Sequence, residues 1–208
     1  MSENIKDFTR KQKSSDMTVE AYQKALKDNK RKEQEIDQLF FEDSLLLGPI
    51  VARVGDLKKR LKKKLAELNR VLLEQIKKKV EASKQLIGEE VDNVLKVIRR
   101  HSYKNIEEVT ETKKFVKQLP DKRLEIQRLI SGVNDKVDVL DENNFRLDEQ
   151  EIVSIWEAFA RPMEIQEEQG DCVGRLEELS NQFQGDLRTM QAQLNADIGE
   201  IQQEFESI

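Results

Sequence analysis

The sequence predicts an all-α fold in which long helices form elongated antiparallel bundles with coiled-coil-like seams, and three observations support this prediction. Apolar residues recur every three or four positions over long stretches, which is the period of an amphipathic helix. Turn formers are rare, with 8 Gly and 3 Pro among 208 residues. Charged and hydrophobic residues each make up 37%, so the apolar share lies below the roughly 45–50% of globular domains. Such a chain buries one stripe on each helix rather than a single deep core.

Residues 1–43 form the first of four segments, and they are polar and highly charged. Their isolated apolar side chains, such as Val19, Tyr22 and Leu26, indicate at most a helix with a thin stripe. A helix with so little apolar surface is marginal unless it packs on a partner. We therefore expect this segment to be marginally helical or disordered.

Residues 44–104 form the second segment, an extended entry followed by one long basic helix. The apolar run around 44–54 contains a Gly-Pro pair, which interrupts helices, so we expect a strand-like bend there. Asp56 is the predicted N-cap of the helix, and its apolar stripe continues to Ile98. A helix of about 45 residues spans ~65 Å, and Gly88 is the point at which we expect it to bend most easily.

Residues 105–160 form the third segment, a helical bundle segment with clear start and stop signals. Asn105 is a predicted N-cap with Glu108 three residues later, which is the pattern of a capping box. Proline lacks an N–H donor and suits the first turn of a helix. We therefore expect one helix to end before Pro120 and a new helix to start there. Asp148 opens the following helix.

Residues 161–208 form the fourth segment, a long acidic helix. We expect Pro162 to kink the chain or to begin another turn. Apolar residues then follow at steps of three and four, and Leu187 and Leu194 lie seven apart. This pattern predicts a coiled-coil-like seam over residues 176–205. No Gly or Pro stop signal closes the seam, so we expect the helix to continue beyond the end of the chain.

The two halves of the chain carry opposite net charges. Residues 1–104 contain 25 Lys/Arg and 17 Asp/Glu, whereas residues 105–208 contain 11 and 24. The basic half could contact nucleic acid, but its charges flank apolar stripes and no aromatic residues are interleaved with them. We therefore interpret the basic residues as solvated helix faces and expect no nucleic-acid partner.

Trp156, Phe159 and Pro162 form the most distinctive side-chain group. Ile152, Trp156 and Phe159 share one helix face at i, i+4 and i+7. We interpret this face as core, which predicts that Trp156→Ala costs about 3 kcal/mol through a cavity. The second interpretation is a docking knob for a neighbouring bundle, and the third is a ligand site. Pro120, Trp156, Phe159 and Pro162 are therefore the structural or interaction candidates.

The sequence offers no constellation of residues for catalysis or metal binding. It contains one His and one Cys, which excludes sites built on several His, a zinc cluster and an intrachain disulfide. No P-loop pattern occurs, and no apolar run approaches the ~18 residues of a membrane helix. We expect a protein of the cytosol or cytoskeleton with no enzyme activity, no cofactor, no metal and no membrane contact.

The order of these features resembles the C-terminal part of the tail of dynein heavy chains, just before the linker. The residues in matching places are Ile106-Glu107-Glu108-Val109, Glu111, Phe115, Leu119-Pro120, Trp156, Phe159 and Pro162. The resemblance spans about residues 44–205 and includes Leu47-Gly48-Pro49-Ile50 ahead of the leucine-striped helix. Each element is common by itself, whereas their order and spacing are much less common. The chain departs from the family pattern at Ala160-Arg161, which leaves the subclass open.

The resemblance implies a role rather than a reaction. Dynein heavy chains are ATP-driven microtubule motors, and this chain would be a non-catalytic tail, or stem, segment of the axonemal type. It would link the motor to its anchor in the cilium or flagellum. The implied partners are other parts of the heavy chain, dynein intermediate and light chains, and axonemal doublet-associated proteins. The alternative is a coiled-coil scaffold or adaptor that dimerises through residues 176–205.

Overall fold

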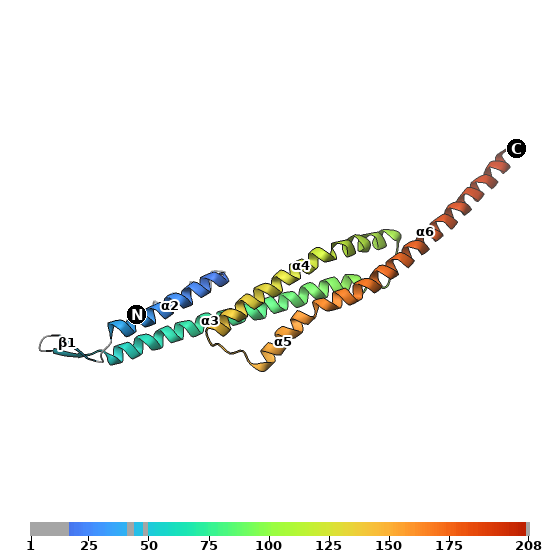
Figure 1. The fold of residues 1–208 in the computed structure, drawn as a ribbon. Helices are drawn as coiled ribbons and strands as arrows, with labels where there is room; N and C mark the ends of the chain where they lie inside the picture. The colour runs from blue at the N-terminus through green and yellow to red at the C-terminus, as the bar shows by residue number, and fades with distance from the viewer. Residues whose placement is uncertain (1–16, 41–43, 48–49, 207–208) are drawn as a thin grey trace. The chain divides into compact units, whose positions relative to one another are not determined.

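The computed structural model describes residues 17–40, 44–47 and 50–206 (Figure 1). Its elements are α2 (Val19–Leu39), β1 (Ser44–Leu47), β2 (Ile50–Arg53), α3 (Gly55–Ile98), α4 (Ile106–Glu142), α5 (Glu149–Ala160) and α6 (Pro162–Glu206). The predicted all-α class is confirmed, since α3, α4 and α6 contain 44, 37 and 45 residues. Within the described ranges, the hairpin of β1 and β2 is the only regular secondary structure that is not helical.

The hairpin corresponds to the predicted strand-like bend. Strands β1 and β2 pair antiparallel, with Leu45 opposite Ala52 and Leu46 opposite Val51. The Gly48-Pro49 pair, which was expected to interrupt the helix, lies outside the described residues.

Helix α2 is well formed in the segment that was expected to be marginal or disordered. Thr18 caps it, because the Thr18 hydroxyl accepts a hydrogen bond from the Ala21 amide at 3.4 Å. Tyr22 and Leu26 are buried, and the Lys79 ammonium of α3 lies 5.7 Å from the Tyr22 ring centroid. The thin stripe is therefore sufficient when α3 supplies the partner surface. Residues 1–16 of that segment lie outside the described residues.

The chain forms two compact units, and each unit combines stretches that are separated in the sequence. The first unit contains the described residues up to Lys84 together with Ser131–Asp148. The second contains Gln85–Ile130 and the described residues from Glu149 onward. Helices α3 and α4 therefore contribute to both units, which differs from the four consecutive segments that were predicted. A long helix can pack on different partners along its length, so its ends need not coincide with the limits of a unit.

In the first unit, α2 packs antiparallel to the first part of α3. The Asn29 side-chain amide donates to the Asn69 side-chain oxygen at 2.8 Å, and Lys62 donates to Asp37 at 2.7 Å. The last part of α4 completes the core. The buried apolar residues are Tyr22, Leu26, Leu72, Leu73, Ile76, Val80, Val133, Val139 and Leu140.

In the second unit, α6 follows the direction of α3. Asp92 pairs with Arg161, and Arg99, seven residues after Asp92, pairs with Glu168, seven residues after Arg161. Helix α4 returns after the turn at residues 99–105, and its Arg123 donates to the Gln166 side chain of α6 at 2.6 Å. The buried apolar residues are Ile87, Val91, Val94, Leu95, Ile98, Val109, Val116, Leu119, Ile126, Ile155, Ala158, Ile165, Cys172 and Leu176.

Two predicted helix boundaries are wrong. Helix α4 runs through Pro120 without a break, and Pro120 itself is exposed. Helix α3 begins at Gly55, which places Asp56 in the first turn and not at the N-cap. Its carboxylate still lies where the helix dipole favours a negative charge.

Candidate interaction surfaces and interhelical contacts

Helix α5 buries the face that carries Ile155 and Ala158, and not the face that carries Trp156. Trp156 is 67% exposed, whereas Ile155 is 8% exposed. The predicted core position of Trp156 is therefore wrong. Successive residues of a helix differ by about 100° in direction, so burying Ile155 turns its neighbour Trp156 toward solvent.

Trp156 instead belongs to an exposed apolar patch on α5, formed with Ile152 and Val153, which are also exposed. The Trp156 ring meets the edge of the half-buried Phe159 ring, with centroids 6.1 Å apart and planes at 77°. Edge-to-face contact of this kind orients aromatic rings. Exposure and fixed orientation favour the second interpretation of this group, a docking knob, which stays a prediction.

Pro162 has the role that was predicted for it. Helix α5 ends at Ala160 and α6 begins at Pro162. Proline at the first helical position loses no hydrogen bond, because the first amides of a helix have no partner within it. Arg161, the residue between the two helices, belongs to a chain of ion pairs.

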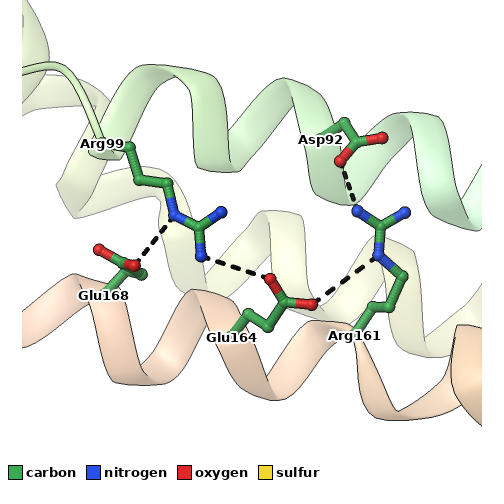
Figure 2. Close-up of polar contacts among 5 residues, drawn as sticks. All are labelled: Asp92, Arg99, Arg161, Glu164 and Glu168. Carbon is green, nitrogen blue, oxygen red and sulfur yellow. Dashed lines mark hydrogen bonds and ion pairs between the residues drawn. The ribbon is translucent and has the colours of Figure 1, made fainter.

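Figure 2 shows this chain of alternating charges between α3 and the start of α6. Arg161 donates to Asp92 and lies 3.9 Å from Glu164. Arg99 approaches the other oxygen of Glu164 at 3.4 Å and donates to Glu168 at 2.9 Å. The hydrogen bond to Glu168 raises the pKa of the Arg99 guanidinium. Surface ion pairs contribute little individually, so we interpret the chain as fixing the register of α6 on α3.

The turn between α3 and α4 is closed by two further arginines. Arg175 of α6 donates to the carbonyl of Ile98 at 2.8 Å and so satisfies a carbonyl at the C-terminus of α3. Arg100 pairs with Glu108 at 2.6 Å. The contact between Arg175 and Ile98 had no signal in the sequence, because nothing local indicates that α6 lies beside the end of α3.

The predicted cap of α4 is confirmed. The Glu108 amide donates to the Asn105 side chain at 2.9 Å, as in a capping box. The Glu108 carboxylate accepts from the Lys104 amide at 3.0 Å rather than from the Asn105 amide. The reciprocal half of the box is thus displaced by one residue.

Individual reactive groups are sparse. Cys172 is buried, and burial raises the pKa of its thiol, which disfavours the nucleophilic thiolate. The one buried polar residue among the described side chains, Thr112, donates to the Glu108 carbonyl at 3.0 Å. The described residues hold no group of three His, Cys, Asp or Glu side chains placed to bind a metal ion. In the same ranges, no helix is long and apolar enough to span a bilayer.

The last part of α6 presents its apolar stripe to solvent. Within the described residues, every side chain from 184 to 198 is exposed. The large apolar ones, which we call the α6 stripe, are Leu187, Met190, Leu194, Ile198 and Ile201. The predicted seam over residues 176–205 therefore has two parts, since Leu176 at its start is buried within the second unit.

Comparison with known proteins adds no assignment: no protein-family model matches the chain, and no curated protein matches it.

Proposed function

We propose that this chain is a non-catalytic tail segment of an axonemal dynein heavy chain, a helical strut between the ATP-driven microtubule motor and the parts that anchor it. The observation that carries the proposal is the order of motifs over residues 44–205, from the Leu-Gly-Pro-Ile run to Trp156, Phe159 and Pro162. Its partners would be other parts of the heavy chain, dynein intermediate and light chains, and axonemal doublet-associated proteins.

The mechanical role is supported by the length of the helices. Helices α3 and α4 contain 44 and 37 residues, so their backbone hydrogen bonds continue over many turns. A pull along such a helix is resisted by packed side chains and by successive hydrogen bonds. A strut needs these properties and needs no reaction centre of its own.

The proposal is tested with antibodies raised against the purified chain and applied to isolated axonemes of the source organism. We expect labelling along the doublets at the positions of dynein arms, and co-extraction of the antigen with the dynein motor ATPase. An antigen that is absent from axonemes, or that separates fully from the motor during extraction, would refute the proposal.

A second experiment tests the role of Trp156 in that assembly. Purified chain is incubated with immobilised dynein intermediate and light chains, and retention is compared for the wild type, Trp156→Ala and the control Leu124→Ala. Leu124 is also an exposed apolar residue, but it lies on α4. We expect the Trp156 variant alone to lose retention. Equal retention of all three proteins would exclude Trp156 as the docking knob.

The alternative function, a coiled-coil adaptor that dimerises through α6, is favoured by one observation, the exposure of the α6 stripe. Burial of Leu176 in its own unit limits such a dimer to the later part of the seam. A Leu187→Cys variant distinguishes this function, because an in-register parallel dimer places the two new thiols together. Rapid oxidation to a covalent dimer would support the adaptor, and its absence would count against it.

A further inference from the structure

The α6 stripe lies on one continuous face of the helix. Leu176, Leu187 and Ile198 are 11 residues apart, and 11 residues of a helix make three turns to within about 20°. The face that is buried at Leu176 therefore continues along α6 as the exposed α6 stripe. Leu176 lines one hollow together with Val116 of α4, and the neighbouring Arg175 donates to the Ile98 carbonyl at the end of α3. A helix pair is therefore the kind of surface that this face fits.

The exposed part of α6 is also acidic. Residues 184–203, the part whose side-chain exposure is described, contain three Asp or Glu and one Arg. Asp197 and Glu200 are among the carboxylates that lie beside the stripe, and both are exposed. A symmetric pairing of two such helices would bring like charges together, which is unfavourable.

At one end of the first unit, α2 and α3 lie side by side beyond the point where α4 ends. Glu142 and Asn143, at the end of α4, line a hollow together with Lys27 and Lys30 of α2. Asn29 of α2 lies opposite Asn69 of α3. Among the described helices of this unit, α3 therefore has only α2 beside it from about Asn69 back to Gly55.

This incomplete end, residues 30–40 and 55–68, is called the open end. The burial of the α3 stripe changes there. Leu72 and Ile76 are buried, whereas Leu57 is exposed and Leu61, Leu65 and Leu68 are half-buried. Leu39 of α2 is exposed as well. In the described part of the chain, the open end thus presents the apolar side chains of two helices and has no third helix beside them.

The open end is basic. Residues 55–68 contain six Lys or Arg and two Asp or Glu, and residues 30–40 contain three of each. Lys58 and Lys62 already pair with Asp37. Lys63 and Lys64 are exposed and lie on the same helical stretch.

We propose that the α6 stripe of one copy docks on the open end of a second copy and completes a three-helix bundle there. The lone helix is acidic with one apolar face, and the helix pair is basic with partly exposed apolar side chains. The lengths are compatible, since 23 residues of α6 span ~34 Å and residues 55–68 span ~21 Å. The inference rests on these two surfaces and does not depend on the proposed function.

This contact joins two different surfaces, so it is heterologous. A copy whose α6 stripe is docked still has an unoccupied open end. A copy whose open end is occupied still has an undocked α6 stripe. Association of this kind proceeds beyond a dimer unless it closes into a ring. Its charge complementarity also makes it weaker at high salt.

Sedimentation velocity of the full chain over a concentration series tests the proposal. We expect the weight-average mass to rise past that of a dimer and to fall when salt is added. Leu194→Asp, at a position that is 58% exposed, should weaken association at least about tenfold without changing the circular dichroism spectrum. The matched control Leu124→Asp, at 54% exposure on α4, should associate like the wild type. A chain that stays monomeric at all concentrations, or one whose association is unchanged by Leu194→Asp, overturns the proposal.

Charge reversal tests the identity of the two surfaces. We expect the double variant Lys63→Glu/Lys64→Glu and the double variant Asp197→Lys/Glu200→Lys each to weaken self-association. A mixture of the two variants should recover it, because each acidic surface then meets a basic one. Failure of the mixture to associate more strongly than either variant alone would overturn the assignment of α6 to the open end.

Discussion

Two adjacent residues of α5 provide the sharpest test of the packing. The perturbation is Ile155→Ala compared with Trp156→Ala. Ile155 is 8% exposed and Trp156 is 67% exposed, although Trp156 is the larger residue and was predicted to be core. The structure therefore reverses the order of stability effects expected from residue size.

The magnitudes follow from burial. Truncating a buried isoleucine to alanine costs 2–5 kcal/mol in general, and a position at the edge of a core should cost about 2–3 kcal/mol. About one third of the Trp156 side chain is buried, or ~80 Å², which corresponds to at most ~2 kcal/mol. Alanine also has the higher helix propensity, by about 0.5 kcal/mol. We therefore expect about 1 kcal/mol for Trp156→Ala.

The assay is urea unfolding followed by far-ultraviolet circular dichroism, with the slope of free energy against urea compared between variants. Equal slopes would show that the variants unfold the same amount of structure. A larger loss for Trp156→Ala than for Ile155→Ala would refute the placement of α5, because it would put the tryptophan in the core.

Three further predictions concern positions at which both a local preference and a tertiary contact affect stability. Pro120→Ala should raise the free energy of unfolding by about 1–2 kcal/mol, because proline is unfavourable inside a helix by about 3 kcal/mol and partly compensates by restricting the unfolded chain. Gly88→Ala should raise it by about 0.5 kcal/mol, because alanine favours a helix over glycine by about 1 kcal/mol and the tight approach of the new methyl group to the flexible end of Arg161, at 3.2 Å, offsets part of that gain. Asp37→Asn should reduce the loss of stability in acid. Hydrogen bonds from Lys62 and then Lys58 lower the pKa of the Asp37 carboxyl, so its contribution is present above the unfolded-state pKa and is lost as the pH falls through the lower folded-state value.

The controls differ for each prediction. For Pro120→Ala, a loss of helix content or of stability would mean that the proline is needed to shape α4. For Gly88→Ala, a loss above ~1 kcal/mol would mean that Arg161 cannot move and that the ion-pair chain is rigid. For Asp37→Asn, unfolding is measured from neutral pH down through about pH 4 and below. If the free energy of unfolding depends on acidic pH in the same way in both proteins, Lys58 and Lys62 do not pair with the Asp37 carboxylate in solution.

Local patterns in the sequence were sufficient to predict the helices themselves. The periodic stripe predicted the long α3, Asn105 predicted the start of α4, and Pro162 predicted the start of α6. These features depend on hydrogen bonds and side-chain directions within a few residues, so the sequence determines them directly. The strand-like bend at 44–54 was predicted for the same reason, from residues that interrupt helices.

Other features depended on the choice of packing partner. Packing against residues that are distant in the sequence decided which face of α5 is buried, and hence that Trp156 is exposed. No local sequence pattern indicates such packing. The continuity of α4 through Pro120 was decided in the same way, since packing on both sides of the proline outweighs the local preference for a break.

The sequence by itself therefore determined that this protein consists of long amphipathic helices, because the period of the apolar residues is a local property. Only the tertiary structure decided which stretches of those helices share a unit and which apolar faces stay uncovered. The α6 stripe and the open end have the same pattern in sequence as the buried stripes. Among the residues that the structure describes, they differ from the buried stripes because no third helix lies beside them, and this depends on where distant helices end.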